Sequence, residues 1–337
     1  MTAADIDAAI ARGAAFLARE QQPDGGIPGF FRDPGADPWP CTDIFPATMV
    51  AHALAVVPEA AAVRTGAVDF LAAEMTEEGL WSFFPRAARQ RGWFPDDVDD
   101  TVSASAALRA AGRPVPRNEP LLLANRDERG LFYTWFAADQ RRAGWRILSP
   151  LRKASRRARH LLRRPVPWNV DRFFEDTGAS PDDVDAVVNA NALFHLGRCP
   201  ETEPIVPYLV AILRAGQEAE CDKWYRNRFL VLYFLARALA PHSKDAAGLL
   251  RARLAAAPPE TPLEHASALC AQDLCGLDPD PALVRRLLEA QSQSGRWPAE
   301  PIYWGDDRHW GSDAVTTALA LEALARCRAA GTANPAN

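Results

Sequence analysis

The chain of 337 residues is 48% hydrophobic and 24% charged, which excludes a disordered protein and leaves room for one large core or two medium ones. Its formal net charge of -5 predicts no nucleic-acid partner, because neutralising phosphates needs a basic surface. No apolar run reaches the ~18 residues of a spanning helix, and Asp5 and Asp7 stand where a signal peptide would be basic. We therefore expect a folded cytoplasmic protein.

A repeated segment organises the chain. Residues 16–27 align without a gap on residues 70–81, and a related version recurs at 287–297. Each copy reads as a helix end, a glycine turn and an apolar or aromatic residue that plugs the core. Repeats of this kind predict an architecture built from one supersecondary unit.

Two kinds of helix alternate along the chain. The first kind is amphipathic, with an Arg/Glu face, and is expected at 4–20, 59–75, 119–125, 203–219, 246–256 and 281–293. The second kind is nearly apolar and mostly opens with an acidic or hydroxyl residue that can cap it; it is expected at 42–57, 97–111, 183–196, 224–239, 263–274 and 312–326. Alternating Val, Ile and Thr runs are missing, so no sheet is expected.

Six such helical hairpins predict an all-α fold, a closed (α/α)6 toroid. We expect one domain over residues 1–330 and a flexible tail at 331–337, with the apolar helices in an inner ring and the amphipathic helices outside them. Hairpin connectivity would place the N-termini of all inner helices at one end of the ring. Around that mouth we expect Asp43, Asp97, Asp99, Asp100, Asp183, Asp185 and Asp313 to converge.

A basic segment interrupts the third hairpin as an insertion at about 141–168. Its central part, 145–164, spaces Leu and Trp as a helix does and is rich in arginine. Three roles are open for it: a solvated surface helix, a peripheral contact with an anionic membrane surface, or an arm that meets a diphosphate.

Four carboxylates occupy five positions at the start of the second apolar helix: Asp96, Asp97, Asp99 and Asp100. Capping needs one oxygen, and the helix dipole adds only about 0.3–1 kcal/mol per charge. Crowded like charges raise the pKa of one member of such a cluster. Keeping that member protonated near pH 7 means raising its pKa by about 3, which corresponds to about 4 kcal/mol. The cluster therefore predicts a strong general acid.

The stretch Asp97-Val98-Asp99-Asp100-Thr101 resembles the DxDDT motif of class II terpene cyclases, the family that includes squalene-hopene cyclases and diterpene cyclases of the copalyl-diphosphate type. The resemblance implies a cyclisation that begins when an alkene or epoxide of a linear polyprenyl substrate is protonated. By the same match Asp99 is the proton donor, and Asp97 and Asp100 orient it.

The repeats also resemble a feature of that family, its QW motifs. Gln21 and Gln291 stand in the glutamine position of the first and third copies, and Met75 replaces it in the second. Trp81 and Trp297 stand in the tryptophan position, where the first copy has isoleucine. Most family members combine two helical domains in a longer chain, so a lone toroid would close its pocket with the insertion, a partner chain or a second copy.

A carbocation needs a dry pocket, because water would quench it, and aromatic faces stabilise it. Loop aromatics that qualify are Phe45, Trp81, Phe84, Trp93, Phe94, Trp135, Trp168, Trp304 and Trp310.

Further residues are candidates to support the acid. Asp185 and Asn189 share one helix face, and Asn189 and Asn191 either hold the proton of the acid or satisfy backbone groups of the inner ring. His309, in a loop at the mouth, is a candidate to contact Asp99 or the substrate.

No cofactor or metal is expected, because the six cysteines lack the spacing of a zinc site. Mg²⁺ would enter only with a diphosphate substrate, held by Asp306 and Asp307. Two alternatives stay open: an inverting glycoside hydrolase that pairs Asp99 with Asp185 or Asp313, and a non-catalytic toroid that serves as a binding or scaffold protein.

Overall fold

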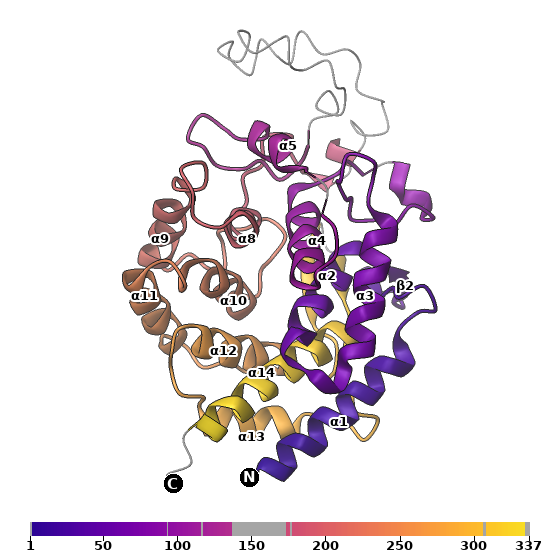
Figure 1. Cartoon of the computed structure of the whole chain (residues 1–337), viewed down its shortest axis with the longest axis vertical. Coiled ribbons are helices and arrows are strands. Elements are labelled where there is room, and N and C mark those ends of the chain that lie inside the picture. Colours follow the sequence, from indigo (N-terminus) through magenta and orange to yellow (C-terminus); the bar gives the residue numbers. More distant parts are fainter. Residues whose placement is uncertain are drawn as a thin grey trace.

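The computed structural model describes residues 2–92, 94–115, 117–136, 173–175, 177–305 and 308–333. In these ranges the chain is mostly helical, and each of the twelve expected helices has a counterpart (Figure 1). The ends differ by at most four residues, except that the last helix continues to Ala333 where an end at about 326 was expected. The expected insertion at 141–168 lies outside the described residues, as do residues 334–337 of the expected tail. None of the described helices is both long enough and apolar enough to cross a membrane.

Six helices contact one another in a closed cycle around the centre of the molecule (Figure 1). They are α2 (Ile44–Ala53), α4 (Val98–Ala110), α8 (Ala186–Leu196), α10 (Arg228–Leu239), α12 (Pro262–Leu274) and α14 (Asp313–Ala333). Each packs on the next in this order, and α14 packs back on α2. In α10 every residue after the first is buried, so a helix of this composition is stable only with neighbours on all sides.

Six more helices lie outside this cycle. They are α1 (Ala3–Glu20), α3 (Ala61–Glu74), α5 (Glu119–Ala124), α9 (Ile205–Ala215), α11 (Lys244–Ala255) and α13 (Pro281–Glu289). Each buries at most one stripe; in α13 the stripe consists of Leu283, Val284 and Leu287. The described ranges also contain three 3-10 turns: Leu54–Val56, Pro58–Ala60 and Arg89–Gly92.

The repeat copies form the same turn after α1, α3 and α13, each around a glycine with positive φ. The Gln21 side-chain amide donates to the carbonyl of its own glycine turn (3.0 Å) and to the Val63 carbonyl on α3 (2.9 Å). The Gln291 amide likewise donates to its own turn (2.9 Å) and to the Ala9 carbonyl on α1 (2.9 Å). Each glutamine therefore joins its turn to the next outer helix.

The residue that ends each copy is a buried plug, as the repeat predicted. Ile27, Trp81 and Trp297 are all at most 1% exposed. The indole N–H groups of the two tryptophans donate to the carbonyls of Leu71 (2.9 Å) and Leu287 (2.6 Å), ten residues earlier. These contacts anchor the turn to its own outer helix.

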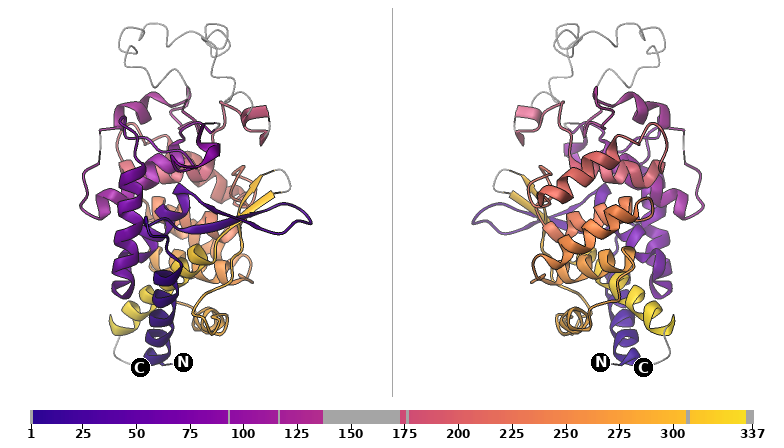
Figure 2. Two further views of the ribbon diagram at one scale, coloured as in Figure 1. Left: turned by 90° about the vertical axis from the view of Figure 1, so that its right-hand side faces the viewer. Right: turned by 90° about the vertical axis from the view of Figure 1, so that its left-hand side faces the viewer.

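A small antiparallel sheet corrects the expectation of an all-α chain. Its strands, in the spatial order β2-β1-β4-β3, are β1 (Pro28–Arg32), β2 (Trp39–Thr42), β3 (Pro301–Gly305) and β4 (Arg308–Gly311). The pairing of β1 with β4 joins the first and last hairpins of the chain and sets Phe31 opposite Trp310. Figure 2 shows the β1–β2 hairpin projecting from the helices. Strands this short, formed from Pro- and aromatic-rich loops, carry no alternating pattern.

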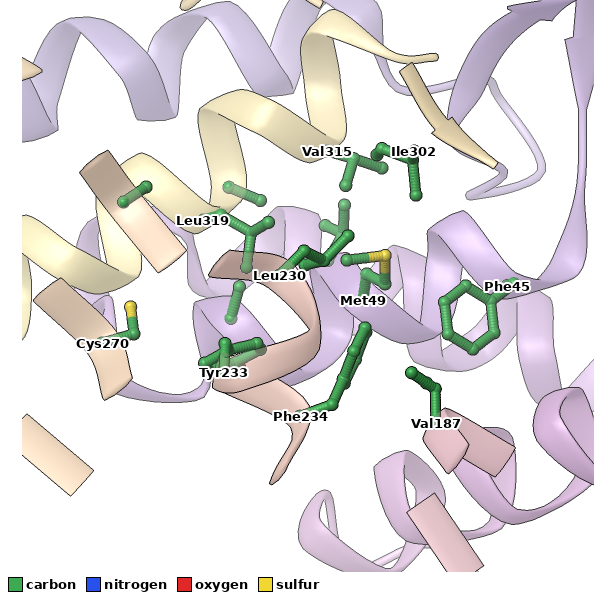
Figure 3. Close-up of a cluster of buried hydrophobic side chains, with 14 of the residues drawn as sticks. Phe45, Met49, Val187, Leu230, Tyr233, Phe234, Cys270, Ile302, Val315 and Leu319 are labelled. Atoms are coloured by element: carbon green, nitrogen blue, oxygen red, sulfur yellow. The ribbon is translucent and has the colours of Figure 1, made fainter. Parts of the chain in front are cut away.

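Apolar side chains fill the centre of the helix cycle. Met49 on α2, Val187 on α8, Leu230 on α10 and Val315 on α14 point toward one another (Figure 3). Phe45, in the first turn of α2, lies at the edge of this cluster.

Candidate active site

A cavity of about 280 Å³ lies where several inner helices begin. Most of its wall consists of the aromatic residues Phe31, Phe45, Phe83, Phe94, Trp135, Trp224, Tyr225, Tyr303 and Trp310. Val188 is also apolar, and the polar lining comes from Asp97, Asp99, Asp100, Thr134, Thr177 and Arg308. The cavity is therefore a mainly apolar site with acidic groups at one position, and its volume is near the lower end for a small-molecule site.

Asp99 lies in the first turn of α4 and is only 8% exposed. The Asn191 amide donates to its Oδ1 and the Tyr225 hydroxyl donates to its Oδ2, each at 2.7 Å. Burial raises the pKa of Asp99 to about 6, although these two hydrogen bonds and the charge of Arg237 act in the opposite direction. Asp99 is therefore protonated in mildly acidic solution. Once it has lost the proton, the Asn191 amide and the Tyr225 hydroxyl both donate to its carboxylate.

Asp97 and Asp100 form a hydrogen-bonded carboxyl pair beside Asp99. Asp97 caps α4, because its Oδ1 accepts from the Asp100 backbone N–H at 2.7 Å. Burial raises the pKa of Asp97 to about 7, and burial together with Asp97 raises the pKa of Asp100 well above its ordinary value. The pair therefore retains a proton and limits the negative charge that Asp99 faces.

Asn191 on α8 connects Asp99 to Arg237 on α10. The Arg237 guanidinium donates from Nη2 to the Asn191 Oδ1 at 2.6 Å. Its carbon Cζ lies 4.3 Å from the ring centre of Phe194 and 5.2 Å from that of Phe234. Of the two asparagines predicted to support the acid, the structure brings Asn191 to it.

Asn189 has the other role that the sequence left open. Its Nδ2 donates to the Phe132 carbonyl (3.1 Å) and its Oδ1 accepts from the Phe132 N–H (2.8 Å), so this amide serves the backbone and not the acid. Asp185 does not touch Asp99 either. Its carboxylate accepts from the Thr134 hydroxyl (2.6 Å) and from the Lys223 backbone N–H (3.2 Å).

The other aspartates expected at the mouth have different partners. Asp43 is fully buried and accepts from the Trp310 indole at 2.8 Å, and burial raises its pKa to about 7. Asp183 pairs with Lys223 at 3.3 Å, and Asp313 pairs with Arg296 at 2.7 Å outside the cavity lining. Of the seven aspartates, Asp97, Asp99 and Asp100 line the cavity, whereas Asp43, Asp183, Asp185 and Asp313 do not.

The predicted pocket aromatics divide into several groups. Phe45, Phe94, Trp135 and Trp310 line the cavity. Trp81 does not, because it plugs the repeat turn, and Phe84 packs behind the lining against Phe83 (5.0 Å between ring centres) and Phe94 (4.6 Å). Trp93 and Trp168 lie outside the described residues, and Trp304 is described only by its backbone position on β3.

His309 is not among the residues that line the cavity or contact Asp99. It precedes Trp310 on β4 and pairs with Arg32 on β1. Successive side chains of a strand point to opposite faces, so the strand that turns Trp310 toward the cavity turns His309 away.

Sequence reasoning missed Tyr225, Tyr303, Phe31, Phe83 and Trp224. Of these, Trp224 and Tyr225 lie shortly before Asn227, the N-cap of α10, and so at the same end of an inner helix as the acid cluster. Their position near the start of an inner helix could have marked these two residues as site candidates. Phe31 and Tyr303 lie on strands whose place depends on long-range pairing, so no local pattern could have identified them.

Among the described residues, no three His, Cys, Asp or Glu side chains are grouped so that they could hold a metal ion. Asp306 and Asp307, the expected Mg²⁺ ligands, lie outside those residues.

This helical fold is similar to that of type II terpene cyclases of known structure. A variant of the cyclase MstE from Scytonema, in complex with its substrate geranylgeranyl dihydroxybenzoate, matches with a TM-score of 0.65 at 15% identity over 97% of this chain and 99% of that chain. Apo MstE matches with a TM-score of 0.65 at 15% identity over 98% and 100% of the two chains. A protein from Actinoplanes matches with a TM-score of 0.64 at 18% identity over 96% and 99%.

No protein-family model and no curated protein matches the sequence. Because MstE is matched over its full length, a chain of this size suffices for the fold, unlike the two-domain chains considered above.

Proposed function

We propose that this protein is a type II terpene cyclase in which Asp99 protonates an alkene or epoxide of a linear isoprenoid. The observation that carries the proposal is the position of Asp99: a buried carboxyl with two hydrogen-bond donors, in the wall of an aromatic cavity. The cyclic contacts of the six inner helices support the (α/α)6 toroid expected from the repeats.

The reaction would start when the Asp99 proton adds to the terminal double bond or to the epoxide oxygen. The bond from the proton to Asp99 breaks, and its electron pair remains on the carboxylate, which Asn191 and Tyr225 stabilise. The positive charge then moves along the folded chain as new carbon–carbon bonds form. The surrounding rings keep water out and stabilise the cation by about 0.5–2 kcal/mol each.

The substrate class follows from the apolar wall. The related fold of MstE binds geranylgeranyl dihydroxybenzoate, and we propose a linear isoprenoid for this cavity too. Mg²⁺ would be needed only for a diphosphate, with Asp306 and Asp307 as its ligands. The same proposal includes a cytoplasmic location, peripheral membrane contact through residues 145–164, and closure of the cavity by a second copy.

Incubating the protein with linear isoprenoids tests the function. Squalene, geranylgeranyl diphosphate and a prenylated benzoate should be offered in turn, and a cyclic product is recognised by mass spectrometry and by its lost double bonds. Asp99→Asn should lower kcat by at least about 100-fold, because general acid catalysis contributes that much. Asp313→Asn is the control, since that carboxylate lies outside the cavity lining.

Equal turnover by Asp99→Asn would remove Asp99 as the acid, and binding without turnover would support a scaffold protein. No observation favours an inverting glycosidase. Asp185 uses both carboxylate oxygens locally, and Asp313 is paired with Arg296.

A further inference from the structure

Asn191 lies between two groups of opposite character. Its Nδ2 donates to Oδ1 of Asp99 at 2.7 Å, and its Oδ1 accepts from Nη2 of Arg237 at 2.6 Å. The amide itself is 1% exposed, so water does not compete for either contact. Asp99, Asn191 and Arg237 come from three successive inner helices, α4, α8 and α10.

An asparagine amide has two nearly identical orientations, related by a half turn that exchanges its oxygen and its nitrogen. The groups around it decide which one is adopted. A guanidinium has N–H donors and no acceptor, so the amide oxygen must face Arg237. The NH2 group must then face Asp99.

This orientation decides where the acid keeps its proton. An N–H donor favours the unprotonated oxygen of a neutral carboxyl group, so Asn191 favours a proton on the other oxygen, Oδ2. Tyr225 lies 2.7 Å from that oxygen. Its hydroxyl can accept from the acid before proton transfer and donate to the carboxylate afterwards.

Arg237 packs against aromatic rings, but its hydrogen bonds are few for a buried charge. It is 9% exposed, and in the part of the chain that the structure describes its guanidinium makes one hydrogen bond, to Asn191. Its Nε has no partner, and no carboxylate within that part of the chain forms an ion pair with it. A buried, incompletely bonded charge is normally destabilising, so this arginine calls for another explanation.

We propose that Arg237 is a positioning residue: it locks the Asn191 amide in one orientation and thereby keeps the transferable proton of Asp99 on Oδ2, the oxygen next to Tyr225. The inference rests on the proposed role of Asp99 as the acid. Arg237 does not line the cavity, and its hydrogen-bonded route to Asp99 within the described residues runs through Asn191, while its charge also acts on Asp99 through space.

A double-mutant cycle on kcat separates this role from a general effect of the charge. Arg237→Gln, which offers either a donor or an acceptor, and Asn191→Leu should each lower kcat by about tenfold or more with KM within about twofold of wild type. The double variant should lose no more than the worse single variant. Arg237→Lys, again a donor only, should retain most of kcat.

The matched control is Tyr233→Phe, one turn away on α10, which loses a hydrogen bond to Glu322 but leaves the ring beside Arg237. It should keep kcat near wild type. Multiplying losses in the double variant, or an unaffected Arg237→Gln, would overturn the proposal.

A measurement without turnover keeps the test independent of the proposed function. At about pH 5 the neutral carboxyl of Asp99 has an infrared C=O band, assigned by its loss in Asp99→Asn. One band is expected in wild type and in Arg237→Lys, and two in Arg237→Gln, where the amide adopts both orientations. A single unchanged band in Arg237→Gln would refute the lock. If the bands behave as expected but no isoprenoid is converted, the function fails and the lock stands.

Discussion

At the scale of single residues, burial is the main origin of the acidity at Asp99. The sequence suggested that crowded carboxylates would raise one pKa, but the largest cause at Asp97, Asp99 and Asp100 alike is burial. Mutual repulsion and hydrogen bonding act mainly between Asp97 and Asp100. Asp99 instead accepts a hydrogen bond on each oxygen, so its carboxylate is already stabilised when the proton leaves.

The turnover rate should follow the protonation of Asp99. Because the acid must be protonated, kcat should fall as pH rises through about 6. Tyr225→Phe removes a hydrogen bond that lowers this pKa, so the falling limb should move to higher pH while the plateau drops. A pH–rate profile of both proteins checks this, and an unmoved limb would mean that another group titrates.

Stability should also fall as pH rises. Asp97 and Asp43 have pKa values near 7 in the folded protein against an ordinary value of 3.8, so between these limits the folded chain binds more protons than the unfolded chain. By linkage the free energy of unfolding is greatest at the low end of this range and declines toward pH 7 and above. Asp100→Asn, which breaks up the Asp97–Asp100 pair, should flatten the dependence of Tm on pH from about 5 to 8. If Tm depends on pH equally in the wild type and in Asp100→Asn, the carboxyl pair is not the origin of the pH dependence.

At the scale of elements, the helices follow from local composition. The inner helices consist mostly of apolar and small residues, so they could be predicted without knowing which helices they pack against. Caps were less predictable. Asp97 caps α4 as expected, whereas the side chains of Asp43 and Asp185 make no cap hydrogen bond and instead accept from Trp310 and Thr134.

The repeat turns should be the positions of these elements least tolerant of a side chain. Gly25 has φ +91°, and a Cβ there would lie 2.1 Å from the Gly66 carbonyl oxygen on the neighbouring helix. We expect Gly25→Ala to destabilise by about 2–4 kcal/mol, because strain and a backbone clash combine. Gly35 has φ +72° with open space around it, so Gly35→Ala should cost only about 1–2 kcal/mol. Chemical denaturation of both variants measures the difference, and similar losses would show that φ alone matters.

At the scale of the whole molecule, the sheet joins the two ends of the chain beside the cavity. Trp310 on β4 lines the cavity, donates to Asp43 before α2 and packs over Gly29 on β1. The wall on this side is therefore complete only when residues from both ends have met.

Gly29→Ala tests this connection. A Cβ at Gly29 would lie 2.3 Å from the Trp310 ring, so the indole must move. We expect a loss of about 2 kcal/mol and a lower kcat, because the cavity wall shifts with the ring. Gly248→Ala, with open space on an outer helix, should instead be neutral or stabilise by up to about 1 kcal/mol. Chemical denaturation and turnover should be measured on both variants. If Gly29→Ala is as stable as the wild type but inactive, the contact between Gly29 and Trp310 serves the cavity and not the stability of the fold.

The sequence by itself determined the helices, the glycine turns and the acid cluster, since each depends on residues within a few positions of one another. Only the tertiary structure decided which groups serve the acid. Asn191 and Tyr225 reach Asp99 across 92 and 126 residues, and the sheet pairs strands from opposite ends of the chain. Such contacts depend on how the helices close into a cycle, and no local pattern of side chains encodes that closure.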